Sequence, residues 1–192
     1  MITKLCHVIA DFFIKENIID EDQREIYKYG FELIISSIIG ILIVVLIGVV
    51  SGNLLQCIIF YIVFCFTRLF CGGYHASSHL LCKLSFTAVL LMVINLNWLL
   101  KEIPNYYWFV LYLYCFIIMC CFSPIENPNK PLTYEQQKRG RRISIIEMLI
   151  WFAVICILYK FECELYHIIV LTLFFVATLM LLALFIKWRN VK

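Results

Sequence analysis

A short polar stretch holds most of the side chains that could carry out chemistry. Between Arg68 and Lys83 the chain reads RLFCGGYHASSHLLCK, which places His75, His79 and Cys82 close together in sequence. Cysteine is an effective nucleophile near neutral pH, provided that a neighbouring imidazole or cation favours its thiolate form. The stretch is therefore typical of a cysteine nucleophile with a histidine base.

Spacing alone leaves the identity of that base open. Residues seven apart on a straight helix share a face but lie roughly 10.5 Å apart along the axis, so His75 reaches Cys82 only if the backbone bends. Gly72 and Gly73, just upstream, are positions where a bend is sterically inexpensive. His79 lies three residues before Cys82, a spacing that makes side chains neighbours on a helix. Without further information, non-catalytic residues at a membrane interface would be the commoner explanation of such a stretch.

The composition predicts that these residues are positioned by membrane helices. Apolar residues make up 64% of the 192 residues and charged residues 15%, whereas soluble domains have roughly 45–50% and 25%. The apolar residues gather in long blocks that contain almost no charge, which is typical of spanning helices. We expect an all-α, polytopic transmembrane helical bundle.

Six apolar blocks predict about six membrane-embedded helices. The second block is short and ends near Arg68, so it either spans a thinned bilayer or forms part of a re-entrant element. The blocks are Phe31 to Val50, Leu54 to Phe66, Leu84 to Leu100, Tyr106 to Phe122, Ile143 to Tyr159 and Leu165 to Ile186.

We expect a single integral membrane domain over residues 1–192, with three polar parts. Residues 1–30 carry many charges and one apolar stripe, which predicts an amphipathic helix at the membrane surface or packed on the bundle, and no cleavable signal peptide. Residues 67–83 form the predicted catalytic loop. Residues 123–142 form a predicted basic cytoplasmic loop.

The distribution of basic residues predicts the orientation. With the N-terminus in the cytoplasm and six spans, 14 lysines and arginines fall inside and only Lys101 and Lys160 fall outside. Because cytoplasmic segments carry the excess of Lys and Arg, both termini are expected to be cytoplasmic. A second block that is re-entrant from outside would break this assignment.

Several other functions are disfavoured. The net charge of +3 is small and gives no sign of a nucleic-acid partner. Six of the ten cysteines lie inside apolar blocks, where cysteine acts as a small hydrophobe, and no cluster has zinc-like spacing, so no metal or other cofactor is expected. The spans carry almost no ionisable residue and no inverted repeat, which disfavours a channel, pump or secondary transporter.

The pattern of Arg68, the run Gly72-Gly73-Tyr74-His75-Ala76 and Cys82 resembles the accessory gene regulator B (AgrB) family, membrane cysteine endopeptidases of bacterial quorum sensing. A proline- and asparagine-containing basic loop at residues 123–131 also matches, and the resemblance covers essentially the whole chain. It implies a bacterial cell-membrane protein that cleaves the C-terminal tail from an AgrD-like precursor peptide. By this resemblance Cys82 is the nucleophile, His75 is the general base, and an acyl-enzyme thioester precedes cyclisation to a thiolactone or lactone.

The resemblance also suggests supporting residues. Arg68 would favour the thiolate or hold a substrate carboxylate, although an arginine snorkelling at a helix end is an equal alternative. A basic group at residues 130–142 would attract an acidic peptide tail, or would serve only as a topology signal against anionic lipid. Gly72, Gly73 and His79 complete the supporting set, and the basic residues are Lys130, Lys138, Arg139, Arg141 and Arg142.

Three questions stay open at this stage. No third catalytic residue is visible in the motif, and Glu126 and Asn127 are only distant candidates. Membrane lipids are expected partners, and a homodimer is compatible with the sequence. A non-catalytic peptide exporter or membrane scaffold is the alternative function, and it would tolerate the loss of Cys82.

Overall fold

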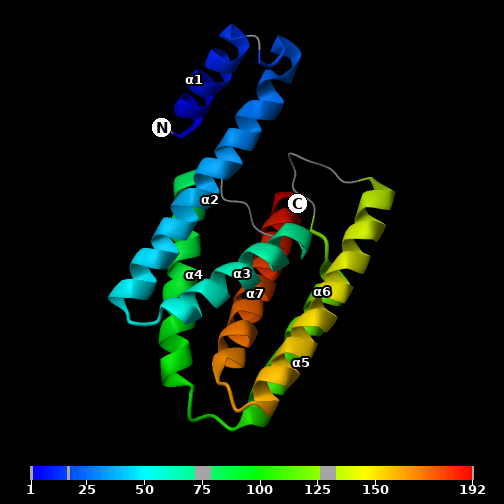
Figure 1. The fold of residues 1–192 in the computed structure, drawn as a ribbon. Coiled ribbons are helices and arrows are strands. Elements are labelled where there is room, and N and C mark those ends of the chain that lie inside the picture. The colour runs from blue at the N-terminus through cyan, green and yellow to red at the C-terminus, as the bar shows by residue number, and fades with distance from the viewer. Residues whose placement is uncertain (1, 17, 72–78, 126–132, 192) are drawn as a thin grey trace. The chain divides into compact units, whose positions relative to one another are not determined.

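The structure is a computed structural model that describes residues 2–16, 18–71, 79–125 and 133–191. These residues form α-helices and one short 3-10 helix and contain no strand, which confirms the all-α prediction (Figure 1). The helices are α1 (Ile2–Lys15), α2 (Arg24–Val50), α3 (Leu54–Cys71), α4 (His79–Leu99), α5 (Asn105–Phe122), α6 (Tyr134–Lys160) and α7 (Leu165–Val191), and the 3-10 helix covers Glu21–Gln23.

Six of these helices are long and apolar enough to cross a membrane, and each corresponds to one of the predicted blocks. In hydrocarbon every backbone N–H and C=O needs an internal partner, and a helix provides these partners within one segment. The protein is therefore a multi-pass membrane protein, as predicted.

The second span is longer than its apolar block. Helix α3 continues beyond Phe66, includes Arg68 in its last turn and ends at Cys71. Its 18 residues give about 27 Å of length at the standard helical rise, close to the ~30 Å of a bilayer's hydrocarbon core. The block looked short because Arg68 interrupts the apolar pattern without ending the helix.

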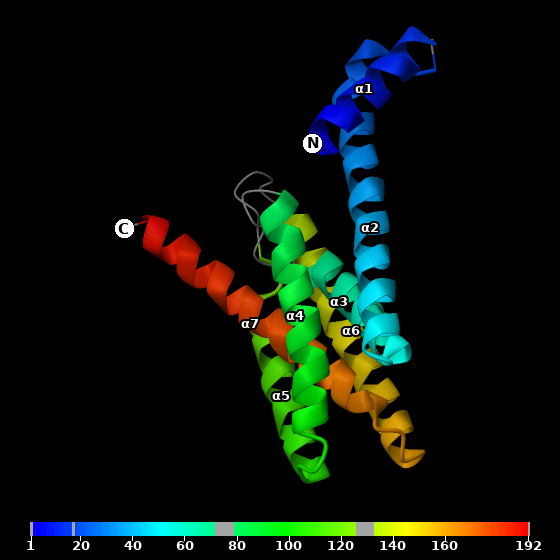
Figure 2. The ribbon, with the colours of Figure 1, turned by 90° about the vertical axis from the view of Figure 1, so that its left-hand side faces the viewer.

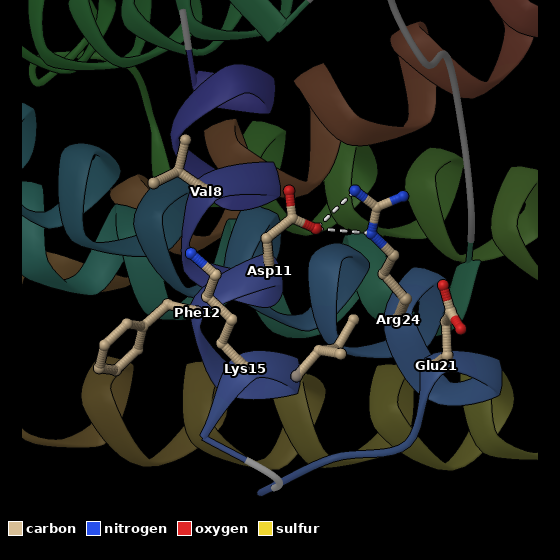
Figure 3. Close-up of a pocket in the computed structure, with 7 residues that line it drawn as sticks. Val8, Asp11, Phe12, Lys15, Glu21 and Arg24 are labelled. Atoms are coloured by element: carbon tan, nitrogen blue, oxygen red, sulfur yellow. Dashed lines mark hydrogen bonds and ion pairs between the residues drawn. The ribbon is translucent and has the colours of Figure 1, made fainter.

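The chain divides into two compact units, Met1–Leu46 and Ile47–Lys192, which we call the N-terminal unit and the helical bundle. In the N-terminal unit, α1 packs against the first part of α2. The ring of Phe13 lies 5.4 Å from that of Phe31, centroid to centroid. Arg24 donates two hydrogen bonds to Asp11 Oδ1, the one from Nε at 2.8 Å (Figure 3).

Helix α1 is amphipathic within this unit. Cys6 and Ala10 are buried, whereas Val8 and Phe12 are 65% and 57% exposed. The two exposed side chains border a shallow pocket, whose charged lining includes the Asp11–Arg24 pair (Figure 3). The full lining is Val8, Asp11, Phe12, Ile14, Lys15, Glu21 and Arg24.

Helix α7 is the centre of the helical bundle. It contacts α3, α4, α5 and α6, and Figures 1 and 2 show it running between these helices and crossing them obliquely. Half of its span is buried, against a third or less of every other span. The core is therefore built around the apolar side chains of α7, among them Ile168, Leu171, Leu173 and Met180.

Two glycines shape the connection from α2 to α3. Gly52 has a φ of +68°, a left-handed conformation that side chains with a Cβ rarely adopt. A Cβ on Gly48 would lie 2.8 Å from the Cα of Leu54, so the start of α3 passes too close to α2 for any larger residue.

Candidate functional site

The ends of α3 and α4 flank residues 72–78, the central part of the predicted catalytic loop, which we call the catalytic segment. Arg68 lies in the last turn of α3, and His79 is the first residue of α4. Cys82 and Lys83 lie in the first turn of α4 and are half-buried. Gly72, Gly73 and His75 lie outside the described residues, so their part of the prediction stays untested.

The structure brings Arg68 and Cys82 together. The Arg68 guanidinium lies 5.6 Å from the centroid of the Phe64 ring, one helical turn earlier, a distance typical of a cation–π contact. The same guanidinium is within electrostatic reach of the thiols of Cys82 and Cys65. The side chain of Arg68 thus extends along its own helix over Phe64 and comes within electrostatic reach of Cys82 on α4.

Lys83 is a second cation beside Cys82, and sequence reasoning missed it. Its ammonium group is within electrostatic reach of the Cys82 and Cys65 thiols. Two positive charges on different helices are therefore within electrostatic reach of the candidate nucleophile. The signal was a basic residue directly after the cysteine, which a search for histidine spacing overlooks.

A backbone hydrogen bond joins the end of α3 to the turn that follows α5. The N–H of Ile125 donates to the carbonyl oxygen of Cys71 at 3.0 Å. Cys71 directly precedes the predicted catalytic segment, and Ile125 directly precedes the segment that contains Lys130. Cys71 and Ile125, which are far apart in sequence, therefore lie side by side.

The turn after α5 is fixed on α6 by buried polar contacts. The hydroxyl oxygens of Ser123 and Ser144 lie 2.6 Å apart, and Ser144 also donates to the Gly140 carbonyl at 3.1 Å. The peptide bond between Ser123 and Pro124 is cis. The Pro124 ring packs against Gly140 so closely that a Cβ there would lie 3.0 Å from Pro124 Cγ.

The basic residues near Gly140 lie on a helix and not in a loop. Helix α6 begins at Tyr134, where Thr133 and Gln136 form a reciprocal capping box, an arrangement that pairs two otherwise unsatisfied backbone donors. Lys138, Arg139 and Arg142 are exposed. Residues 134–142, which the sequence analysis assigned to a loop, thus present their charges at fixed helical spacing.

Arg141 differs from its basic neighbours. Its Nε donates to the carbonyl oxygen of Cys120 at 3.1 Å, in the last turn of α5. A cation at a helix C-terminus satisfies an unpaired carbonyl and complements the helix dipole. All four basic residues are therefore exposed, and Arg141 in addition makes a structural contact with the end of α5.

Almost the whole chain matches one known protein family. A family model described as AgrB, accessory gene regulator B, matches residues 6–184. The chain belongs to the AgrB family. AgrB proteins have an accessory gene regulator role in quorum sensing, and the family is associated with an AgrD precursor peptide.

Individual AgrB-like proteins share about a quarter to a third of their aligned residues with this chain. The chain is 25% identical over 158 residues to AgrB-like protein 2 of Clostridium perfringens strain 13, covering 78% of this chain and 72% of the relative. It is 31% identical over 134 residues to an AgrB-like protein of Listeria innocua, and the match covers 68% of this chain and 64% of the relative. No solved structure matches.

Within residues 2–16, 18–71, 79–125 and 133–191, no three His, Cys, Asp or Glu side chains come together in a way that could hold a metal ion.

Proposed function

We propose that this AgrB-family protein is a membrane cysteine endopeptidase that cleaves the C-terminal tail of an AgrD-like precursor peptide. The Cys82 sulfur attacks the carbonyl carbon of the scissile bond while its proton passes to His75. The C–N bond breaks, and His75 gives that proton to the leaving amine of the tail. The acyl group stays on Cys82 as a thioester.

A nucleophile within the substrate completes the reaction. Its thiol or hydroxyl attacks the thioester carbonyl, the C–S bond to Cys82 breaks, and the displaced proton returns through His75 to the Cys82 sulfur. The product is a thiolactone or lactone ring. The thioester must be kept from water until this attack, and a site at the membrane edge helps to exclude water.

The single observation that carries the proposal is the pair of cations at Cys82. Arg68 from α3 and Lys83 from α4 are both within electrostatic reach of this thiol. Cysteines buried in apolar surroundings are inert, whereas reactive cysteines sit in electropositive, partly exposed surroundings. Half-buried Cys82 fits the second description.

The basic side chains of α6 are proposed to hold the acidic tail of the substrate. Lys138, Arg139 and Arg142 are exposed, and the Ile125–Cys71 hydrogen bond ties the turn leading to α6 to the start of the catalytic segment. Complementary charge steers a partner and fixes its orientation more than it adds raw affinity. Lys130, outside the described residues, is proposed to act with them.

We also propose a cytoplasmic location for the site in the bacterial cell membrane, with both termini on the same side. The support is the distribution of basic residues, 14 against 2. A membrane-impermeant thiol reagent added to intact cells should leave Cys82 unmodified. Modification of Cys82 from outside would reject this orientation.

The central experiment is co-expression of the protein with its precursor peptide. Cys82→Ala and His75→Ala should abolish processing, and the wild type should accumulate a covalent peptide adduct that hydroxylamine releases. Cys163→Ala is the matched control, since Cys163 is another half-buried thiol, in the turn between α6 and α7. His79→Ala identifies the base: loss of processing in this variant alone would show that His75 is misassigned.

The same experiment separates the alternative function. A non-catalytic exporter or scaffold would still support release of the peptide after Cys82→Ala and would form no adduct. Continued processing by Cys82→Ala therefore overturns the endopeptidase proposal.

A further inference from the structure

A carboxyl group is buried inside the helical bundle. Glu147 lies on α6, one turn after Ser144, and its side chain is only 8% exposed. Acidic residues inside a spanning helix are energetically costly and rare, so each one calls for a function and a partner. The endopeptidase mechanism above makes no use of Glu147.

The surroundings of Glu147 come from two helices. On α6, Trp151 Nε1 donates to Glu147 Oε1 at 3.2 Å. On α3, the fully buried Thr67 hydroxyl is adjacent to the carboxyl group. Glu147 Oε2 and Thr67 Oγ1 are both buried, and apart from this polar contact with each other neither atom has a hydrogen-bond partner among the described residues.

Thr67 and Cys71 place this carboxyl group at the end of α3. The two residues are four apart and therefore lie on one face of the helix. Cys71 is fully buried and close to Glu147, Ser144 and Ser123. The side chain of Arg68, next to Thr67, instead extends along α3 over Phe64 and comes within reach of Cys82.

We propose that Glu147 is a positioning residue that holds the last turn of α3 against α6 through Thr67. This inference rests on the proposed function. A displacement of Thr67 would move its neighbour Arg68 relative to Cys82, and would move Cys71, where the catalytic segment begins. Glu147 thus links α6, which carries the exposed basic residues, to α3, which carries Arg68.

The proposal requires directional polar contacts and not volume alone. A glutamine at this position keeps a carbonyl oxygen that accepts from Trp151 and an amide that donates to the Thr67 hydroxyl. A leucine fills similar space but leaves two buried polar groups, the Trp151 N–H and the Thr67 hydroxyl, without this partner. The two substitutions therefore separate positioning from packing.

The kinetic test uses the full-length protein in membranes with its precursor peptide. Glu147→Leu is expected to lower kcat about tenfold and to leave KM within about twofold, because a lost buried hydrogen bond of this kind changes a rate by roughly that factor. Glu147→Gln keeps both polar contacts, so its kcat should stay near that of the wild type. The control is Glu135→Gln, an exposed glutamate on the same helix, which should leave both constants unchanged.

A double-mutant cycle tests whether Thr67 is the intermediary. Thr67→Val should lower kcat as Glu147→Leu does, and the double variant should be no worse than either single variant, since both remove the same contact. Additive losses would overturn the role of Thr67. Loss of kcat in Glu147→Gln equal to that in Glu147→Leu would overturn the positioning role.

A second readout needs no precursor peptide. Cys71 is fully buried, so N-ethylmaleimide should modify it slowly in the wild type and in Glu147→Gln, and rapidly in Glu147→Leu. Mass spectrometry of the peptide containing Cys71 measures this, with half-buried Cys163 as the internal reference. Protection of Cys71 in Glu147→Leu overturns this inference even if the endopeptidase proposal holds. If the wild type processes no peptide, the labelling result still decides the link from Glu147 to α3.

Discussion

The backbone N–H of Ile125 donates a hydrogen bond to the carbonyl oxygen of Cys71 at 3.0 Å. This contact closes the last turn of α3 onto the turn after α5 and uses a helix-terminal carbonyl that has no intrahelical partner. Changes to the turn at residues 123–125 should therefore reach the start of the catalytic segment.

Gly140→Ala should destabilise the bundle, because the added Cβ would lie 3.0 Å from Pro124 Cγ and the turn would have to move. We expect a loss of about 1–3 kcal/mol in the free energy of unfolding, the usual cost of overpacking. Gly30→Ala is the matched control on α2, where a Cβ meets nothing within 4 Å. It should gain about 0.5–1 kcal/mol from improved helix propensity. Thermal unfolding in detergent measures both, and shifts of equal sign would contradict the prediction.

Ser144→Ala should weaken the same turn. The hydroxyl of Ser123 would lose its buried partner at 2.6 Å, at an expected cost of about 1–3 kcal/mol. Ser37→Ala is the control, since the Ser37 hydroxyl is exposed and bonds only its own helix. Its effect should stay within about 0.5 kcal/mol. Equal melting temperatures for the two variants would show that the Ser123–Ser144 contact does not stabilise the turn.

Arg141→Gln and Arg142→Gln should affect different properties. Arg141 bonds the Cys120 carbonyl, so its loss should lower the melting temperature. Arg142 is exposed, so its loss should leave the melting temperature unchanged and raise KM for the precursor, and high salt should weaken the wild-type advantage. Melting curves and steady-state kinetics on both variants check this, and a KM effect confined to Arg141→Gln would reject substrate docking by the exposed residues.

Lys83→Gln should lower kcat/KM, because it removes one of two cations within reach of Cys82. Lys83→Arg keeps the charge and should retain most of the activity. Lys101→Gln, an exposed lysine in the turn before α5, should have no effect. The measurement is the steady-state kinetics of precursor cleavage. Full activity of Lys83→Gln would show that Lys83 has no role in the site.

The spanning helices could be predicted from sequence because lipid imposes one demand, apolar length, on each of them. The ends of these helices could not. Arg68 suggested an early end of the second span, and the charges at residues 138–142 suggested a loop, although the Thr133–Gln136 pair was a visible sign of a helix start. Charge reports where a segment meets water and not where its helix begins.

The sequence indicated which residues belong to the candidate site, but it did not indicate which of them contact each other. The nearness of Arg68 to Cys82 is compatible with the family resemblance, but the roles of Lys83 and Glu147 depend on which helix faces meet. The pattern of polar and apolar residues along α6 does not reveal that Glu147 lies next to Thr67 on α3. That orientation is set by packing between helices that are distant in sequence. His75, the predicted base, stays a prediction.

The capping box at Thr133 has a consequence for partner selection. A basic segment that is already helical presents Lys138 and Arg142 one turn apart before any peptide arrives, so association need not freeze that stretch of backbone. A peptide whose acidic groups match this interval gains over one with equal charge in another arrangement. If the basic residues dock the peptide as proposed, the first turns of α6 would select peptides by the spacing of their acidic groups as well as by their charge.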